Sequence, residues 1–470
     1  MSRSEVPPTD DVSPTAPWYR GVTPYMWLVL VIASLGWTFD IFEGQIFVAS
    51  MREAMPALLP AGTDAGIIAF YNNLAMGAFL IGGALGGILF GALSDRIGRT
   101  RTLILTILMY SLFASVTAFA QSWWHMVVLR FLVAMGAGGE WAVGCAMIAE
   151  VFPSRARAHV GSIFHASGIL GTLLATLVGV TVIGNEALGE NGWRWAFALG
   201  AAPALLTLWI RWKLREPEQW VQARRRASED PAQRTGHLAD LFKPGLLSRT
   251  VLGVSLAAIG IATFWGVHIY GKDLTLKAAQ THYLSVAGLA PSADAQAQAA
   301  ALSPYTGKLK NAEMLGMFLV TIGGGVGQVL FGPICSRMGR RGAFILYHLG
   351  SVITSLVVFQ YLHSAPMTTL CLVLPIFGFM TLGLHAGYAV YFPELYPTRL
   401  RGTGSGFCFN VGRLFAATIL LIIGWMRRPT DAGGLGLTLE NTASILSLLF
   451  LVGVVLLLFA PETKGRELPE

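Results

Sequence analysis

The chain has 470 residues, of which 54% are hydrophobic and only 13% are charged. Soluble domains carry about 25% charged residues, so this composition excludes an ordinary soluble enzyme of the same length. The formal net charge of +7 does not indicate a nucleic-acid partner, because the basic residues lie between long apolar runs, where they determine membrane topology.

The chain begins with a polar segment, residues 1–24, which we expect to be a disordered tail because it has no apolar core ahead of a cleavage site. Twelve apolar runs follow, each close to the about 17–25 residues that a helix needs to cross a bilayer. They begin near Tyr25, Ile67, Thr102, Trp123, His159, Trp193, Thr250, Ala312, Ala343, Met367, Thr403 and Thr442. We therefore predict an all-α polytopic membrane protein with twelve transmembrane helices.

A charged segment separates the sixth run from the seventh. We assign residues 215–248 to a cytoplasmic linker between two six-helix bundles, 25–214 and 249–460, and residues 461–470 to a second tail. Another long connection, about residues 271–311, falls on the outer side. Its Ala/Gln/Ser-rich part is expected to be flexible or weakly helical, and we assign it no role.

The distribution of basic residues predicts the orientation of the chain. The connections after the second, fourth, eighth and tenth runs hold ten basic residues, whereas four connections on the other side hold only Arg52. Because positive charge accumulates in cytoplasmic connections, the linker and both termini are predicted to lie in the cytoplasm, beneath the inner membrane.

Two short patterns occur in both halves of the chain. Gly91, Arg96, Gly98 and Arg99 recur 241 residues later as Gly332, Arg337, Gly339 and Arg340, and Glu150, Pro153, Arg155 and Arg157 recur 244 residues later as Glu394, Pro397, Arg399 and Arg401. The chain is therefore predicted to be a duplicated bundle. Duplication of a membrane bundle is typical of transporters that work by alternating access.

Nothing in the aqueous segments indicates catalysis. The four cysteines are single and widely spaced, and there is no metal-ligand spacing, phosphate-binding Gly-Lys-Ser loop or nucleophile pattern. We expect no cofactor and no metal, and a transport reaction driven by a gradient. The partners that we expect are a small-molecule substrate, protons and lipid, and one chain already holds both halves of a carrier, so a monomer is expected to function.

Three motifs carry a resemblance to a known family. The stretch 91–99 resembles the loop 2–3 signature of the major facilitator superfamily, Arg130 followed by Gly136, Gly138 and Gly139 resembles its helix 4 motif, and the stretch 461–465 resembles the ending of its sugar-porter branch. The resemblance covers essentially the whole chain and implies two pseudo-symmetric six-helix bundles.

Two further stretches narrow the branch. Residues 39–43 resemble the paired acids in helix 1 of bacterial symporters for organic and aromatic acids, and residues 138–141 resemble helix 4 of metabolite and sialate proton symporters. The sequence departs from the family in two places. The paired glutamines of sugar porters are absent from helix 7, where residues 264–268 stand instead, and Ser336 replaces the counterpart of Asp95.

Four charged residues in the apolar runs are candidates for proton coupling. Asp40 is predicted near the bilayer centre, and Glu43 lies on the same helical face. Buried acids must be protonated, paired or hydrated, so a permanent ion pair is the alternative to proton transfer. Glu140 could instead brace a helix contact. The resemblance ties Arg130 to proton coupling, although it could also extend toward the membrane surface.

Arg413 is the candidate for holding an anionic substrate, because guanidinium matches a carboxylate in two hydrogen bonds. Asn410 lies on the same face and could orient the ligand. The alternative is that Arg413 permanently neutralises Asp40 or Glu43. Further substrate-binding candidates are aromatic or titratable, although packing roles are as plausible for them. They are Trp265, His165, His268, His385 and Tyr388.

The repeated loop residues are candidates for a cytoplasmic gate. The resemblance implies that they latch the two halves on the cytoplasmic side, since ion pairs near water exchange partners at modest cost. These residues are Gly91, Asp95, Arg96, Gly98, Arg99, Glu150, Arg155, Arg337, Arg340, Glu394 and Arg399. The alternative is that the arginines only set the topology.

These observations predict a secondary active transporter that couples the uptake of a small organic anion to protons. The anion would be a mono- or dicarboxylate, an aromatic acid or an acidic sugar. A neutral sugar or polyol is the alternative substrate, indicated by residues 461–465, and a membrane sensor without transport is a remote alternative. Sodium coupling stays open.

Overall fold

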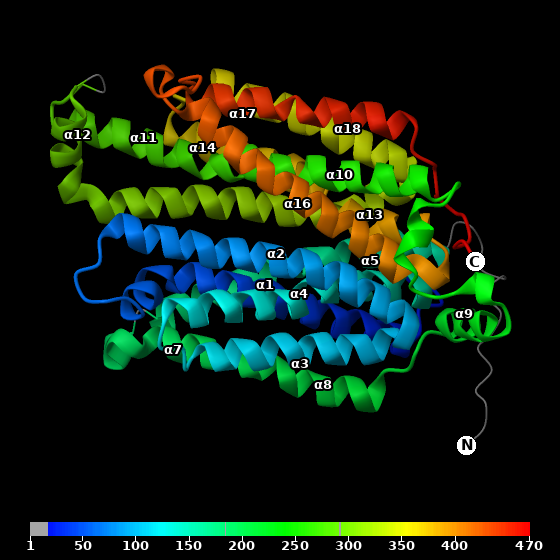
Figure 1. Cartoon of the computed structure of the whole chain (residues 1–470). Coiled ribbons are helices and arrows are strands. Elements are labelled where there is room, and N and C mark those ends of the chain that lie inside the picture. Colours follow the sequence, from blue (N-terminus) through cyan, green and yellow to red (C-terminus); the bar gives the residue numbers. More distant parts are fainter. Residues whose placement is uncertain (1–16, 184, 291–292) are drawn as a thin grey trace. The chain divides into compact units, whose positions relative to one another are not determined.

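The computed structural model describes residues 17–183, 185–290 and 293–470, and within these ranges the regular structure is entirely helical (Figure 1). The first half contains α1 (Pro24–Ala57), α2 (Ala65–Ile97), α3 (Arg99–Thr117), α4 (Trp123–Val151), α5 (Ser154–Ala166), α6 (Gly168–Val178), α7 (Gly192–Ala198), α8 (Ala202–Lys213) and α9 (Glu218–Glu229). The second half contains α10 (Leu247–Gly266), α11 (Gly271–Val286), α12 (Ala295–Leu302), α13 (Thr306–Leu356), α14 (Met367–Gly383), α15 (Ala386–Leu395), α16 (Arg401–Arg427), α17 (Leu439–Ser447) and α18 (Leu449–Leu458).

The helices account for the twelve expected crossings. Ten helical segments of the described chain are long and apolar enough to span a bilayer. One of them, Gln296–Tyr361, is 66 residues long and holds two crossings, because α13 is interrupted at Gly339, whose φ of 85° is not helical. Another crossing is divided into α7 and α8 by a short 3-10 turn, Leu199–Ala201. The prediction of twelve membrane helices is confirmed.

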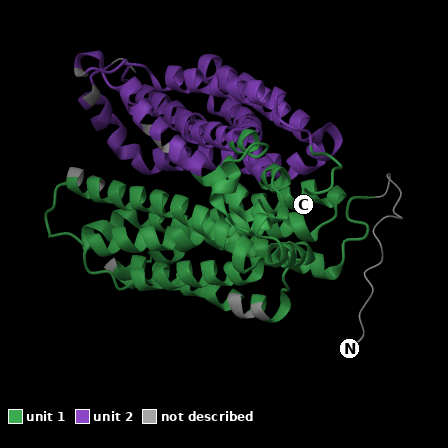
Figure 2. Ribbon diagram, turned by 45° about the vertical axis from the view of Figure 1, so that its right-hand side comes forward, with its two compact units in different colours: residues 1–250, 389–410, 463–470 green, residues 251–388, 411–462 purple. Residues whose placement is uncertain are grey.

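The chain forms two compact units (Figure 2). Unit 1 comprises residues 1–250, 389–410 and 463–470, and unit 2 comprises residues 251–388 and 411–462. Unit 1 thus contains the first half, the linker, the end of α15, the start of α16 and the last eight residues. The predicted boundaries 25–214, 215–248 and 249–460 describe the two repeats of the sequence and stay a prediction.

The long connection between the seventh and eighth crossings is more helical than expected. The helix α11 occupies Gly271–Val286, so our expectation that the connection begins at residue 271 is wrong. The Ala/Gln-rich stretch forms α12, whose first turn is capped by Asp294. The Asp294 carboxylate accepts hydrogen bonds from the backbone N–H groups of Gln296 and Ala297, both at 3.2 Å. This cap explains why a weakly apolar segment is helical.

Close contact between α2 and α4 gives unit 1 a dense centre. A Cβ atom at Gly138 of α4 would lie 2.0 Å from the carbonyl oxygen of Gly83, and one at Gly86 of α2 would lie 2.0 Å from that of Met135. Only glycine permits this approach, as is common where membrane helices pack without a hydrophobic driving force. The contact fixes α4, which carries three of the candidate charged residues, Arg130, Glu140 and Glu150.

Candidate functional site

Unit 1 buries the acid pair of α1. The exposed fraction is 9% for Asp40 and 1% for Glu43, so neither acid faces lipid or bulk water. Within the described residues, neither carboxylate oxygen of Glu43 has a hydrogen-bond partner. Glu43 interacts electrostatically with Arg130 and with Asp40. The structure therefore brings the two predicted acids and the predicted arginine into one cluster.

Arg130 enters this cluster from α4. It is fully buried, its Nη2 donates a 3.0 Å hydrogen bond to Thr117 Oγ1, and its guanidinium group lies 4.6 Å from the ring centre of Phe197. Its Nε and Nη1 have no hydrogen-bond partner in the described chain. Arg130 is thus a buried cation, two of whose donors have no partner in the described chain.

Glu140 lies ten residues, about three turns, further along α4 than Arg130. It is 1% exposed, and its carboxylate oxygens have no hydrogen bond of ordinary geometry in the described part of the chain, although the Tyr110 hydroxyl is close enough to interact with them. Its electrostatic partners are Asp40 of α1 and Tyr110 of α3. Glu140 belongs to the same unit as the acid pair but has no cation beside it among these partners.

His165 lies near the end of α5 and is held by two tryptophans. The indole N–H of Trp141 donates to His165 Nδ1 at 3.1 Å, and that of Trp37 donates to the His165 carbonyl at 3.0 Å. Because an indole can only donate, Nδ1 must be the acceptor. Trp141 also stacks on Phe409, with ring centres 4.1 Å apart. His165 is therefore oriented within an aromatic wall of unit 1.

The other predicted histidines lie in unit 2. His268 Nδ1 is 2.8 Å from Thr381 Oγ1, and its ring stacks on Phe264 at 5.2 Å. His385 contacts the edges of Phe264 and Tyr388, at 5.9 Å and 5.5 Å between ring centres. Both histidines are buried. Phe264 thus connects the two histidines in one aromatic cluster.

Tyr388 and Trp265 extend the same cluster. The Tyr388 hydroxyl donates to the carbonyl oxygen of Leu256 at 2.9 Å and is fully buried, which is a packing contact. Trp265 is partly buried and packs edge-on against Phe264 at 5.3 Å. Of these two, Trp265 keeps more surface available for a ligand.

The candidate anion-binding residues lie on α16. Asn410 belongs to unit 1, is fully buried, and donates through Nδ2 to the carbonyl oxygen of Gly406 at 2.9 Å. Its Oδ1 has no hydrogen-bond partner in the described ranges. Arg413 lies three residues further on, belongs to unit 2, and is partly buried. Neither side chain is therefore exposed on the surface of its helix.

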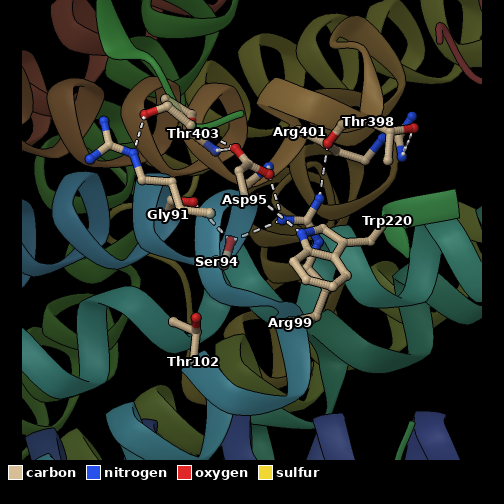
Figure 3. A network of polar contacts seen from close by, with 12 residues as sticks. Gly91, Ser94, Asp95, Arg99, Thr102, Trp220, Thr398, Arg401 and Thr403 are labelled. Carbon is tan, nitrogen blue, oxygen red and sulfur yellow. Dashed lines mark hydrogen bonds and ion pairs between the residues drawn. The ribbon is translucent and has the colours of Figure 1, made fainter. Parts of the chain in front are cut away.

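A buried polar network within unit 1 contains the most strongly connected of the predicted gate residues (Figure 3). Arg99 forms ion pairs with Asp95 and with Glu150, the latter at 2.7 Å, and donates to the carbonyl oxygen of Thr398 at 3.0 Å. Arg401 donates to the same Glu150 oxygen at 2.9 Å. The side chains of both ion pairs of Arg99 are fully buried. We call Asp95, Arg99, Glu150 and Arg401 the Arg99 network.

Asp95 connects α2 to the start of α16. Its carboxylate accepts hydrogen bonds from the backbone N–H groups of Gly402 at 3.1 Å and Thr403 at 2.7 Å, and from the Thr403 hydroxyl at 2.5 Å. Figure 3 shows Asp95 between Thr403 and Arg99. A carboxylate at a helix N-terminus is favourable, because the first N–H groups of a helix have no partner within it. The hydrogen-bond partners of the predicted gate residue Asp95 therefore lie at the start of α16.

Two helical segments, one in each repeat, are capped by glutamates that sequence reasoning missed. Glu216 accepts hydrogen bonds from the N–H groups of Arg99 at 2.6 Å, Thr100 at 3.2 Å and Arg101 at 3.3 Å. In unit 2, Glu462 accepts from the N–H groups of Arg340 at 2.9 Å and Arg341 at 3.1 Å. Each capped segment follows a glycine with positive φ, Gly98 at 117° or Gly339 at 85°. The signal was present, since each glutamate lies beside a proline just after an apolar run.

The linker supplies further anchors to this end of unit 1. The indole N–H of Trp220 donates to the Asp95 carbonyl at 2.9 Å, and Arg96 Nε donates to the Gly236 carbonyl at 3.1 Å. Arg399 forms a 2.6 Å ion pair with Asp240. Burial would raise the pKa of Asp240, but hydrogen bonds and charge from Lys243 and Arg399 outweigh it and lower the pKa to about 2. Trp220 and Asp240 were not predicted, because nothing in the linker marks them.

The remaining gate candidates have other contacts. Arg155 donates to the carbonyl oxygen of Arg20, and Glu394 accepts a 2.6 Å hydrogen bond from the Thr463 hydroxyl. Gly91 contacts α16, because a Cβ atom there would lie 2.6 Å from the Gly402 carbonyl oxygen. In unit 2, Arg340 is buried and Arg337 is exposed. The second repeat therefore uses these positions differently from the first.

Comparison with known proteins agrees with the motifs. The family model described as Major Facilitator Superfamily matches residues 26–420. A protein named as a 4-methylmuconolactone transporter of Cupriavidus pinatubonensis is 30% identical over 95% of this chain and 93% of its own length. The cis,cis-muconate transport protein of Acinetobacter baylyi is 28% identical over 83% and 85% of the two chains, and a sialic acid transporter of Escherichia coli is 25% identical over 84% and 86%.

A solved structure shows the same fold. The proton:xylose symporter XylE, bound to 6-bromo-6-deoxy-D-glucose, matches with a TM-score of 0.72 at 18% identity, over 94% of this chain and 98% of the other. At this identity the likeness concerns the fold alone. It confirms the expected architecture of twelve helices in two bundles, and the relatives are transporters and not enzymes.

Proposed function

This chain is a member of the major facilitator superfamily of membrane transporters, and we propose that it is a proton-coupled symporter that carries a small organic anion across the cytoplasmic membrane. The transport would proceed by alternating access, with both termini in the cytoplasm and one chain as the working unit. The single observation that carries the proton coupling is the buried cluster of Asp40, Glu43 and Arg130 in unit 1.

The cluster supports proton coupling because ionised groups are costly to bury. Glu43 is 1% exposed and has no hydrogen bond in the described chain, while Arg130 beside it keeps two nitrogens without a partner. Ionised groups in such a place are stabilised only by each other or by water. The gain or loss of a proton therefore strongly changes the electrostatic free energy of the cluster. We infer that protonation of the acid pair releases Arg130 from attraction to Glu43 and so alters the packing of α1 against α4.

Two observations favour an organic anion as the substrate. Arg413 offers a planar fork that binds a carboxylate through two hydrogen bonds, and Asn410 on the same helix keeps its Oδ1 without a partner in the described ranges. The relatives named above are described as transporters of muconate and sialic acid. The aromatic cluster around His268, which like Arg413 belongs to unit 2, would contribute an apolar wall to the binding site.

The Arg99 network is proposed to be the cytoplasmic latch. It connects α2, α3 and α4 of the first repeat to the start of α16 of the second repeat, within unit 1. Because the pairs share acceptors, with Arg99 and Arg401 both on Glu150, withdrawing one arginine leaves the acid with the other. An exchange of this kind lets ion pairs break without leaving a charge uncompensated.

A neutral sugar is the second candidate substrate, and one observation weakens it. The ending 461–465 resembles that of sugar porters, but Glu462 within it caps the helix that follows Gly339. This structural role explains the ending without any reference to the substrate. The sugar-porter glutamines of helix 7 are replaced by residues 264–268, of which Phe264 and His268 form the aromatic cluster.

Uptake into proteoliposomes tests the proposal. Purified protein should accumulate radiolabelled muconate or sialic acid several-fold more when the external side is acidic, and a protonophore should remove the difference. Xylose, as a neutral probe, should not be accumulated. Anion uptake that is indifferent to the proton gradient would refute the coupling, and uptake of xylose in place of the anions would select the neutral-sugar alternative.

A further inference from the structure

The segment before α1 is folded against the start of α5 within unit 1. Residues 17–22 form two tight turns, in which the backbone N–H groups of Arg20 and Val22 donate to the carbonyl oxygens three residues earlier, at 3.0 Å and 3.1 Å. Arg155 of α5 donates through Nη2 to the carbonyl oxygen of Arg20. Gly21 has a positive φ of 83°, and a Cβ atom there would lie 2.9 Å from Arg155 Nη2. The turns are therefore shaped by a glycine and attached to α5 by an arginine.

Four aromatic rings gather at this junction. Trp18 stacks on His159 of α5, with ring centres 4.7 Å apart and planes 5° from parallel. The rings of Tyr19 and Trp27 meet Trp18 edge-on, at 5.7 Å and 5.9 Å. Tyr19 is 56% exposed and Trp27 is 38% exposed, so these two rings lie on the surface of unit 1. We call Trp18, Tyr19, Arg20, Trp27, Arg155 and His159 the Trp18 collar.

The charges of the collar are all positive. Arg20 is the only charged residue within residues 17–39, and α5 carries arginines but no acid. The Arg20 side chain is exposed, and Arg155 is half-buried with an Nε that has no hydrogen-bond partner in the described chain. The other arginine of α5, Arg157, is buried and donates to the carbonyl oxygen of Ala149 at 3.0 Å. Neither segment that builds the collar therefore supplies an acid to neutralise its two arginines.

This combination of side chains suits the boundary between a bilayer and water. Tryptophan and tyrosine concentrate at the level of the lipid headgroups, because their rings are amphipathic. Guanidinium groups match the oxygens of a phosphate group, and each cation close to an anionic membrane surface strengthens attachment about fivefold. A small anion in solution would contact the arginines but would leave the exposed rings of Tyr19 and Trp27 in water. An anionic lipid satisfies both parts of the collar.

We propose that the Trp18 collar is a binding site for an anionic phospholipid of the cytoplasmic leaflet. Arg20 and Arg155 hold the phosphate group, and Tyr19 and Trp27 lie among the headgroups beside it. The bound lipid adds to the contacts that join the segment before α1 to α5, so it stabilises this end of unit 1. The choice of leaflet rests on the orientation in the proposed function, whereas the site itself does not depend on the transported substrate.

Lipid retention measured by native mass spectrometry tests the site. The full chain, purified in detergent, is mixed with phosphatidylglycerol or with phosphatidylcholine of the same acyl chains. Wild type should retain phosphatidylglycerol more strongly, and Arg20→Gln combined with Arg155→Gln should weaken that retention by at least about tenfold. Arg155→Lys should lose less, because it keeps the charge without the planar fork. Arg52→Gln changes an exposed arginine near the other end of α1 and should leave the retention as in wild type.

Two further variants separate the collar from a general loss of structure. Arg20→Gln alone changes an exposed side chain, and it should weaken retention of phosphatidylglycerol about fivefold at an unchanged melting temperature in detergent. Trp18→Ala keeps both arginines but removes the stack on His159, so it should also weaken retention because the turns are released. Inorganic phosphate should not displace the lipid. Displacement would assign the arginines to a soluble anion and overturn the lipid site.

Equal retention of the two lipids by wild type, or retention that the double variant does not change, would overturn the proposal. An equal loss in Arg52→Gln would do the same, since it would show a nonspecific effect of charge. If the protein accumulates no substrate in proteoliposomes, the proposed symport fails while the lipid measurement still decides the collar.

Discussion

Arg401 donates a 2.9 Å hydrogen bond to the Glu150 carboxylate, 251 residues earlier in the chain, where both side chains are fully buried. Arg99 donates to both oxygens of the same carboxylate, including the one that Arg401 contacts. Glu150 is therefore the shared acceptor of two arginines, one from each repeat. This sharing makes it the residue whose loss most affects the network.

Glu150→Gln should strongly destabilise unit 1. Removing the charge of Glu150 leaves Arg401 without its ion pair and leaves Arg99 with Asp95 alone, and loss of a buried partner of this kind costs about 3–5 kcal/mol. Thermal unfolding in detergent should show a large drop in the melting temperature. The matched control is Arg225→Gln, which breaks the Arg225–Glu229 pair, whose side chains are 82% and 64% exposed. Exposed pairs contribute about 0–1 kcal/mol, so equal drops for the two variants would contradict the assignment.

Glu216→Ala should uncap α3, because three backbone N–H groups lose their acceptor. Loss of such a cap costs about 0.5–2 kcal/mol. Glu462→Ala is the natural counterpart and should have a comparable effect, since it removes two N–H contacts in unit 2. Hydrogen exchange of the first turn after Gly98, or after Gly339, should rise in the corresponding variant only. Faster exchange elsewhere, with the first turn unchanged, would show that neither glutamate acts as a cap.

The ion pairs of Asp240 should make the stability of the folded protein depend on pH. Its pKa is lowered in the folded protein to about 2, so the folded state favours the carboxylate more than the unfolded chain does. This stabilisation is complete above the unfolded pKa of about 4 and is lost as the pH falls toward 2. Asp240→Asn should therefore melt at a lower temperature than wild type at pH 7, with a difference that shrinks below pH 4. A difference independent of pH would indicate that packing, and not the ion pair with Arg399, is responsible.

Arg413→Gln distinguishes the two candidate substrates. If the guanidinium group holds a carboxylate, uptake of muconate or sialic acid should fall by at least about tenfold, because a charge-assisted pair worth about 1.5–3 kcal/mol is lost. A neutral sugar would be carried almost as well as before. Arg427→Gln, an exposed arginine at the end of the same helix, controls for a general loss of positive charge. Unchanged anion uptake in Arg413→Gln would exclude this arginine from the binding site.

The membrane helices were predictable because their signal is local. Twelve apolar runs of spanning length appear in the sequence, and they match the crossings even where Gly339 and the turn at Leu199–Ala201 interrupt the helices. The helix α11 was missed because residues 271–286 hold several charged and polar side chains, among them Lys272, Asp273 and Lys277, so that their composition resembles an aqueous connection. Composition identifies what lies in the membrane, but it does not identify where a helix continues beyond it.

The types of the site residues could be predicted from the sequence, but the hydrogen-bond partners of these residues mostly could not. Buried acids and arginines stand out in apolar runs, so Asp40, Glu43, Arg130 and Glu140 were found, and the structure gathers them in unit 1. The partners of Asp95 could not be found in this way. They are backbone N–H groups of Gly402 and Thr403, which every residue type possesses. Contacts made by the main chain over 307 residues leave no pattern in the sequence.

The contacts of Glu216, Trp220 and Asp240 bear on how the protein can be divided. All three residues follow the last membrane helix of the first repeat, yet they bind α3, α2 and the segment before α16. A separately produced first repeat that stops at Lys213 would leave the start of α3 without its acceptor. Extending the fragment through Asp240 keeps these three residues in the same piece as α2 and α3, so co-expression of two complementary fragments should give more folded protein with a cut after residue 243 than with a cut before residue 216.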